Sequence, residues 1–587
     1  MSVIMQKPPS GGPPFAAALQ LPPSIAQVLW HRGIRTEQEA TAFLSPALEQ
    51  LGSPHAFPQM TRAVDRLLKA VRAEEPIAIY ADRDVDGLTG LAILARTLRS
   101  VGGQVIWGSP VKGRGLERPV LERLIQTSRA KILVLVDCGT AEHTELAWLA
   151  GQGMDVIIAD HHRLTGERPP ALAWIHPGVM DTEDGQAPAG CVMAFKLAQA
   201  IWLSFLGPDD RERLDYFLFS HLDLVAMGVL ADRVSLTGEN RILVWHGLRR
   251  LACSRKVGVA ALTRFFRLTP RSEPLTVREV TWQLIPILNA GGRLGHPELT
   301  AELLMTEDPD AAYECIDRLL ALNTRRREAQ DKSLIYFEKA VLEQCAVDSD
   351  PVLIALADGL EPSVTGLAAQ ALVRKYGRPT FLFVRQGAET VGSGRGTAGV
   401  DLFQWVETHQ HWLVKYGGHQ GAVGLTVRTE DFAAFRGHLL KTAHAAFAAN
   451  HTVLSLGRAL EVSPEIEAEV SLPELDAYWW ISYERLGPFG QGHPQPLFKL
   501  TGVDAIAPVT RRKSKRPAQE IVLKGDTSER RAQLDDEQLT ARARDIISQI
   551  QKDAVPGPWV VVGYPSAARR SEKTFKWVMV DLWRRHG

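Results

Sequence analysis

The stretch MDVIIADHHR, residues 154–163, decides how the rest of this sequence is interpreted. Its apolar run is rich in β-branched residues and predicts a short buried strand, which ends abruptly at Asp160, His161 and His162. Three adjacent polar side chains that can bind a metal or transfer a proton cost free energy to bury unless they have partners. In α/β proteins the carboxyl end of a strand is where ligands bind. We therefore expect partners at the ends of neighbouring strands.

Three further apolar segments end in acidic residues. They are IAIYADRDVDG (77–87), ILVLVDCGT (132–140) and LVAMGVLAD (224–232). Together with the first stretch we interpret them as strands of one parallel sheet, because parallel strands bring their carboxyl ends to the same edge. The acidic residues that this arrangement would gather are Asp82, Asp84, Asp86, Asp137 and Asp232.

Composition limits the class of protein. The chain has 587 residues, of which 45% are hydrophobic, enough for several domains. Lys plus Arg equals Asp plus Glu at 67 each, so an anionic partner must be bound by a local patch, such as RRKSKR at 511–516. A solvated loop explains that patch nearly as well.

The cysteines and the apolar runs indicate a cytoplasmic protein. The five cysteines are scattered and never in C-x-x-C spacing, which argues against a disulfide framework and against a zinc site. No apolar run reaches the roughly twenty residues of a membrane span. The Pro- and Gly-rich start, residues 1–15, is predicted to be a loose tail.

Strand and helix patterns divide the chain into five regions. Strands and helices alternate in a doubly wound α/β pattern, a helix of about ten turns without Gly or Pro follows, and then a second α/β unit. Short strands separated by turns come last and predict an OB-like β-barrel. The predicted regions are 1–60, an N-terminal tail and lead-in; 61–251, the first α/β domain; 252–345, a linker region with the long helix, 308–345; 346–453, the second α/β domain; and 454–587, the barrel.

The acidic residues suit divalent metal ions. Asp82, Asp84 and Asp86 alternate, so on an extended strand they would point to one face and repel each other unless cations lay between them. A solvated acidic turn is the simpler alternative for any one of them. With Asp137, Asp232 and the imidazole of His161, however, they form a mixed oxygen and nitrogen set typical of Mn²⁺ or Mg²⁺. Two such ions bridged by one carboxylate are used to hydrolyse phosphate esters.

The ordered series of motifs resembles the DHH and DHHA1 phosphoesterases, and within them the RecJ-type exonucleases. The resemblance covers about residues 61–453 and the stretch before the barrel. The motifs that carry it are DRDVDG, VDCGT, ADHHR, GVLAD, LNAGGRLGH (288–296), GSGR (392–395), YGGHQGAVGL (416–425) and RLGPFGQGHPQPLF (485–498).

The resemblance implies a DHH catalytic domain, a DHHA1 substrate-binding domain, and two Mn²⁺ or Mg²⁺ ions. It assigns one ion to Asp82, Asp84 and Asp137, and the other to Asp86, Asp137, His161 and Asp232. His162 would face the scissile phosphate, so that Asp137 and His162 are the expected catalytic residues. The implied activity is 5′ to 3′ hydrolysis of single-stranded DNA to 5′ nucleotides in repair and recombination. The expected partners are single-stranded DNA, single-strand binding protein and a helicase, and the expected state is a monomer.

Several polar and Gly-rich motifs are candidates for binding the strand. Each has a simpler explanation as a surface loop or a tight turn, and for Lys112 and Arg114 a solvated basic loop is equally good. Glycines permit close approach of a phosphate, which favours a substrate role for the others. Trp282 could stack on bases, but a place in the core is favoured. The candidates are Lys112, Arg114, Asn289, Arg293, Ser393, Arg395, Gly418 and His419.

The sequence departs from the family pattern in places, and two other functions are alternatives to the exonuclease. DGLEPSVTG (358–366) stands where the family carries a Trp-His-x-Gly-Val run, and His493 stands where Asn is common. A non-catalytic DNA-binding scaffold would show eroded metal ligands, and none is eroded. A hydrolase of short oligonucleotides or cyclic dinucleotides would need neither the long helix nor the barrel. We expect the exonuclease.

Overall fold

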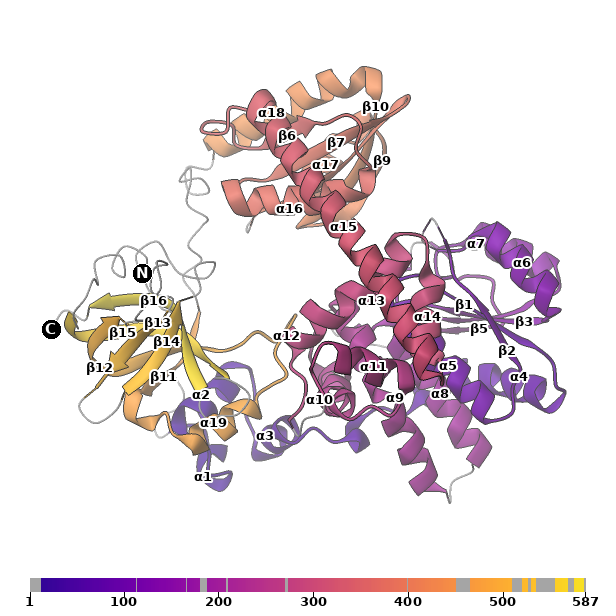
Figure 1. Ribbon diagram of the computed structural model, residues 1–587, viewed down its shortest axis with the longest axis horizontal. Helices are drawn as coiled ribbons and strands as arrows, with labels where there is room; N and C mark the ends of the chain where they lie inside the picture. Colours follow the sequence, from indigo (N-terminus) through magenta and orange to yellow (C-terminus); the bar gives the residue numbers. More distant parts are fainter. Residues whose placement is uncertain are drawn as a thin grey trace. The chain divides into compact units, whose positions relative to one another are not determined.

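The computed structural model describes residues 12–111, 113, 115–164, 166–179, 187–206, 210–269, 273–397, 400–449, 465–508, 520–525, 529–534, 555–567 and 575–584. The chain forms two compact units, one of residues 1–323 with 465–587 and the other of residues 324–464. The predicted long helix is α15 (Pro309–Gln344), within which the boundary between the units falls (Figure 1).

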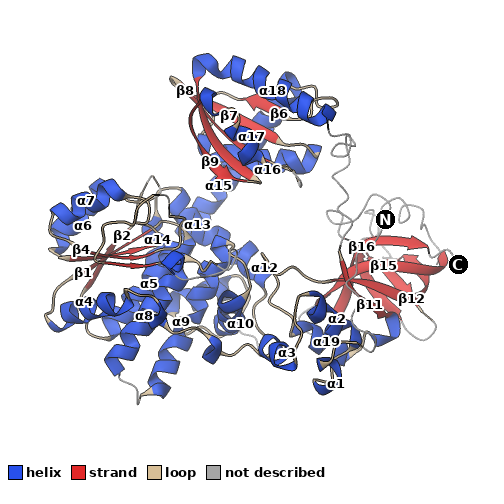
Figure 2. Cartoon of the chain, turned by 180° about the vertical axis from the view of Figure 1, so that it is seen from behind, coloured by secondary structure: helices blue, strands red, loops and turns tan. Residues whose placement is uncertain are grey.

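A five-stranded parallel sheet organises the first unit. Its order is β2-β1-β3-β4-β5, which confirms the doubly wound α/β pattern. Helices lie on either side of this sheet (Figure 2), so apolar side chains of its strands are buried on both faces. The strands are β1 (Ile77–Ala81), β2 (Val105–Gly108), β3 (Ile132–Val136), β4 (Asp155–Ala159) and β5 (Ala173–Ile175). On one face lie α4 (Met60–Arg72), α5 (Val85–Ser100), α8 (Gly190–Leu206) and α9 (Arg211–Asp232), and on the other α6 (Arg118–Ser128) and α7 (His143–Gly151).

One predicted strand of this sheet is wrong. The segment 224–232 is the last part of α9, so Asp232 comes from the end of a helix. The reason is that a nine-residue apolar run fits a buried strand and a buried helix equally well. Among the described residues, 212–232 is also the one helix long and apolar enough to cross a membrane, and 56% of its most apolar window is buried inside the protein.

Five short helical segments lead from α9 to α15. They are α10 (Gly238–Ala252), α11 (Val257–Phe265), α12 (Val277–Glu279), α13 (Ile285–Arg293) and α14 (Pro297–Met305). A π-helical turn, η4 (Val280–Leu284), joins α12 to α13 without a break in helical backbone angles.

The second unit is a mixed sheet with helices, as expected for the second α/β domain. Its order is β6-β7-β8-β10-β9. The GSGR and YGGH motifs lie inside strands β8 and β9 and not in the tight turns that were the alternative, because both strands pair along their length with β10. The elements are β6 (Leu353–Leu356), β7 (Thr380–Gln386), β8 (Glu389–Arg395), β9 (Leu413–His419), β10 (Ala422–Arg428), α16 (Thr365–Tyr376), α17 (Leu402–Glu407) and α18 (Phe432–Ala449).

The last strands form a six-stranded sheet in the region predicted to be an OB-like barrel. Their pairings run in a ring, β12–β13–β14–β16–β15–β12, and β11 adds to β12 in parallel. The elements are β11 (Ile466–Ser471), α19 (Ala477–Glu484), β12 (Leu497–Pro508), β13 (Glu520–Lys524), β14 (Glu529–Leu534), β15 (Val555–Ala567) and β16 (Phe575–Arg584). The basic run 511–516 lies outside the described residues.

The N-terminal region contributes to the core of this barrel. Phe15, Ile25 and Leu29 are buried in one apolar cluster with Trp479 and Phe498. They belong to α1 (Phe15–Ala18) and α2 (Pro23–His31), which α3 (Glu37–Leu44) follows. The predicted loose tail, residues 1–15, is therefore wrong at its end, because the buried Phe15 begins α1, while residues 1–11 lie outside the described part of the chain. The apolar side chains of α2 pack in the same cluster as those of the barrel.

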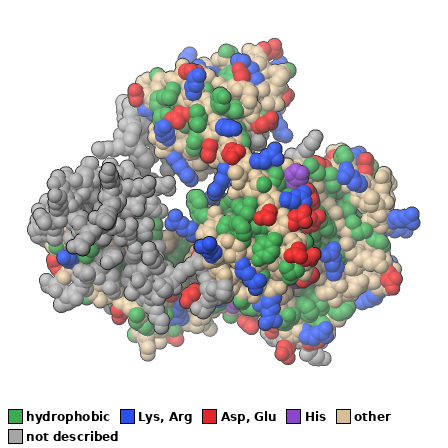
Figure 3. Space-filling model, viewed as in Figure 1, with side chains coloured by type: hydrophobic (Ala, Val, Ile, Leu, Met, Phe, Trp, Pro, Cys, Tyr) green, Lys and Arg blue, Asp and Glu red, His purple; other side chains and the backbone are tan. Residues whose placement is uncertain are grey.

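Charged side chains of both signs are interspersed over the face of the molecule shown in Figure 3. This distribution agrees with the equal numbers of basic and acidic residues.

Candidate metal centre

The loop after β1 distributes its three carboxylates over two groups. Asp84 is the N-cap of α5, and its Oδ1 accepts hydrogen bonds from Asp86 N (3.0 Å) and Gly87 N (3.3 Å). Asp86 consequently lies in the first turn of a helix, so the expectation that the three carboxylates alternate along an extended strand is wrong. The hydrogen bonds with which Asp84 caps α5 stabilise the helical turn over an extended conformation of residues 82–86.

The N-terminus of α8 holds Asp86. Its Oδ2 accepts a hydrogen bond from Gly190 N (2.7 Å) and its Oδ1 from Cys191 N (2.9 Å). The amides and the dipole at a helix N-terminus favour a negative charge there. Burial, followed by the charge of Asp232, nevertheless raises the pKa of Asp86 to about 6. A bound cation would offset that cost.

Asp137 lies at the centre of the acidic residues. It follows β3 in a left-handed conformation (φ 58°), and its amide donates to Ala159 O (2.9 Å). Its buried Oδ1 accepts no hydrogen bond from the described residues, although His161 Nε2 is 3.2 Å away. Burial, followed by the charges of Asp86 and Asp84, raises the pKa of Asp137 well above its usual range. A carboxylate in such a place is stabilised by a positive ion.

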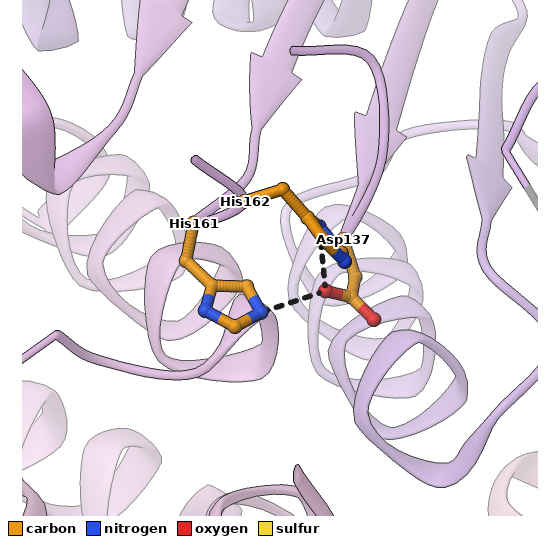
Figure 4. Close-up of side chains that lie close together, drawn as sticks. All are labelled: Asp137, His161 and His162. Carbon is orange, nitrogen blue, oxygen red and sulfur yellow. Dashed lines mark ion pairs between the residues drawn. The ribbon is translucent and has the colours of Figure 1, made fainter. Parts of the chain in front are cut away.

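Three sets of side chains place their ligand atoms within 4.8 Å of one another. His161 Nε2 lies 3.5 Å from Asp232 Oδ2 and 3.8 Å from Asp86 Oδ2, and a nitrogen of each histidine faces the same Asp137 oxygen (Figure 4). Hard carboxylate oxygens with one imidazole fit Mn²⁺ or Mg²⁺. The sets are Asp82, Asp84 and Asp137; Asp86, His161 and Asp232; and Asp137, His161 and His162.

Asp160 and His176 orient His162, a role that sequence reasoning missed. Asp160 Oδ1 lies 2.8 Å from His162 Nδ1, and its Oδ2 accepts from Thr140 N (3.1 Å). The bond to Asp160 raises the pKa of His162 to about 9. Burial alone would raise the pKa of Asp160, but the bond and charge of His162 hold it below its usual range. His176, whose Nδ1 accepts from Gly178 N, places Nε2 2.8 Å from His162 O. A buried acid directly before two histidines was the available signal for Asp160.

Asn289 and Arg293 come from α13, beside the loop that follows β1. Asn289 Oδ1 accepts a hydrogen bond from Val85 N (3.1 Å), and Arg293 is exposed. A Cβ added at Gly292 would lie 2.0 Å from Arg83 O, so this glycine permits close contact between α13 and that loop. This close contact accounts for a glycine at position 292 without the expected role in admitting a phosphate. Trp282, expected in the core, is 68% exposed.

The other candidate substrate residues lie in the second unit or outside the described residues. Ser393 Oγ accepts from Thr365 Oγ1 (2.8 Å), and Arg395 Nη1 donates to Gly394 O (2.8 Å) in β8. Gly418 lies in β9 at φ 143°. Lys112, Arg114 and the side chain of His419 lie outside the described part.

Comparisons with known proteins identify the family. The model of the DHH family, N-terminal domain, matches residues 76–229, and the DHHA1 domain model matches residues 349–445. The single-stranded-DNA-specific exonuclease RecJ of Thermus thermophilus is 31% identical over 495 residues, which are 83% of this chain and 67% of that protein. The chain belongs to the RecJ family. The RecJ of Dickeya dadantii is 30% identical, with 81% of this chain and 83% of that protein covered.

Solved RecJ structures agree with the fold. The crystal structure of RecJ from Thermus thermophilus with Mn²⁺ has a TM-score of 0.74 and 27% identity, covering 98% of this chain and 78% of that one. The structure of RecJ with Mg²⁺ from the same source has a TM-score of 0.69, 24% identity and coverage of 98% and 76%, and shows the fold alone. The acidic side chains of this RecJ-family chain are thus a candidate site for Mn²⁺ or Mg²⁺.

Proposed function

We propose that this RecJ-family chain is a metal-dependent exonuclease that hydrolyses single-stranded DNA from the 5′ end to 5′ nucleotides, in DNA repair and recombination. The observation that carries the proposal is the place of Asp137, buried between two groups of ligand atoms. A carboxylate that can bridge two cations is what phosphodiester hydrolysis by two metals requires.

In this proposal some side chains bind the metal ions and others contact the DNA. Asp82 and Asp84 with Asp137 would hold one ion. Asp86, Asp137, His161 and Asp232 would hold the second. Bound there, the ions supply an activated water and stabilise negative charge on the phosphate. His162 bonds to Asp160 through Nδ1 and is 53% exposed, so its Nε2 is the atom available to the scissile phosphate.

The remaining regions supply strand binding in this proposal. The DHHA1 residues Ser393, Arg395 and Gly418, with His419, would contact the DNA backbone, as would Asn289, Arg293, Lys112 and Arg114. The domain boundaries follow the predicted regions 61–251, 346–453 and 454–587. OB-folds bind single strands by stacking and charge, which supports a strand-binding role for the barrel.

Partners and location complete the proposal. The five cysteines are free, in accord with the reducing cytoplasm. We propose a cytoplasmic monomer that acts with single-strand binding protein and a helicase, because these supply and protect single strands. Sedimentation of the purified chain with and without single-strand binding protein tests both the monomer and the association.

Three DNA substrates of the same sequence test the activity. A linear single strand, a circular single strand and a blunt duplex are incubated with the protein in Mn²⁺ or in EDTA. We expect nucleotides to be released from the linear single strand in Mn²⁺ alone. Binding without hydrolysis would support the non-catalytic scaffold, and activity on dinucleotides alone would support the short-oligonucleotide hydrolase.

A further inference from the structure

A stripe of polar and aromatic residues, exposed except at Asn289, runs along the continuous helical segment 277–293. The segment consists of α12, the π-helical turn η4 and α13. Its buried side chains include Val280, Leu284, Ile287 and Leu288, which enter the core of the first unit. The segment also carries polar and aromatic residues spaced four, seven and four residues apart, three of them exposed and one half-buried. These residues are Arg278, Trp282, Asn289 and Arg293.

Trp282 is the unusual member of the stripe. Its side chain is 68% exposed between the buried Val280 and Leu284, and it lies in the π-helical turn. Exposing a large aromatic side chain leaves apolar surface in water, and π-helical turns occur often at functional sites. The exposed indole therefore points to a function other than stabilising the fold.

The stripe begins at the metal centre. Asn289 Oδ1 accepts from Val85 N, directly beside Asp84 and Asp86, and Gly292 contacts Arg83 O closely. Trp282 precedes Asn289 by seven residues, which is roughly 10 Å along a helix. A DNA strand held at the metal centre can reach across that distance within a few nucleotides.

We propose that Trp282 is a base-stacking platform for one of the first nucleotides of the single strand, with Arg278 and Arg293 on either side for its phosphates. The inference rests on the proposed exonuclease function. Aromatic faces hold bases of any sequence, and Arg side chains bind phosphate oxygens. The position is suited to a strand rather than to a protein partner, because the flanking residues are cationic and the stripe leads to the metal ligands.

Steady-state kinetics on strands with a single abasic nucleotide test the proposal. In the wild-type protein the abasic nucleotide is moved stepwise from the 5′ end, and at one position KM should rise on the order of tenfold. Trp282→Ala should show the same rise in KM on the intact strand and no further rise when that base is absent. Trp282→Phe should retain most of the affinity.

Tyr216→Ala is the matched control. Tyr216 is 60% exposed but lies sixteen residues before Asp232 on α9, roughly 24 Å along the helix. Its loss should leave KM unchanged. If wild-type protein degrades single strands and Trp282→Ala has the same KM, stacking is excluded and the indole is left for a protein partner. If KM rises equally with and without the abasic nucleotide, the effect is structural and stacking is also excluded. A wild-type protein without nuclease activity would instead refute the proposed function.

Discussion

At the scale of single residues, Asp137 combines a buried carboxyl group with the central position in the site. Its raised pKa means that the ionised carboxylate destabilises the metal-free fold at neutral pH. Asp137→Asn should therefore abolish Mn²⁺-dependent cleavage, while the thermal midpoint of the metal-free protein stays the same or rises. Nuclease assays and calorimetry in EDTA measure the two effects.

The exposed Asp65 of α4 is the control for this substitution. Asp65→Asn should change neither cleavage nor the thermal midpoint by more than the error. Retained Mn²⁺-dependent cleavage by Asp137→Asn would disprove the two-metal assignment.

His493 gives a pH prediction remote from the metal centre. Burial, followed by the charge of Arg32, lowers its pKa to about 3. Its Nδ1 lies 2.9 Å from Arg32 Nη1, Arg32 also pairs with Glu467 (2.7 Å), and His493 Nε2 lies 2.8 Å from Leu486 O. His493 is thus neutral in the folded state, whereas its pKa is about 6.5 in the unfolded state. Stability from this group is full above pH 6.5 and is lost as the pH falls toward 3.

His493→Asn, the residue common in the family, should remove this pH dependence. The free energy of unfolding of the wild type should fall faster below pH 6.5 than that of the variant, by up to about 1.4 kcal/mol per pH unit. Urea unfolding between pH 7.5 and 4.5 measures the difference. Parallel curves for the two proteins would show that folding does not lower the pKa of His493.

At the scale of elements, the start of α8 fixes two carboxylates at once. Gly190 N donates to Asp86, and a Cβ added at Gly190 would lie 2.6 Å from Asp137 Cβ. Gly190→Ala must therefore displace Asp137 or α8. We expect kcat/KM to fall on the order of a hundredfold, because small displacements of catalytic groups have effects of that size.

Gly437→Ala in α18 is the matched glycine control. In the described part of the chain a Cβ there meets nothing within 4 Å, so the substitution should stabilise the protein by about 0.5–1 kcal/mol without changing kcat/KM. Equal kinetics for Gly190→Ala and the wild type would show that α8 does not position Asp137.

The sequence predicted three elements of the site correctly and misjudged others for identifiable reasons. β1, β3 and β4 were predictable because each is a short apolar run that stops at a polar side chain. The end of α9 was not, because apolarity alone does not distinguish a buried helix from a buried strand. The role of Asp160 depends on hydrogen bonds that form only in the folded loop. The exposure of Trp282 depends on the phase of a π-helical turn, which no local pattern specifies.

At the scale of the whole molecule, the two ends of the chain fold together. Phe15, Ile25 and Leu29 complete the core that contains Trp479 and Phe498, so removing everything after residue 454 would expose apolar surface of α1 and α2. Aggregation of the truncated protein would then be mistaken for loss of DNA binding. Activity must therefore be tested on the full chain.

The direction of degradation tests the central claim most directly. The full chain is incubated in Mn²⁺ with one linear single strand that carries a label at its 5′ end or at its 3′ end, and EDTA and Asp137→Asn serve as controls. We predict that the 5′ label appears at once in mononucleotides, while the 3′-labelled strand shortens progressively, and that both controls leave the strand intact. Release of the 3′ label first, or cleavage in EDTA, would contradict the account.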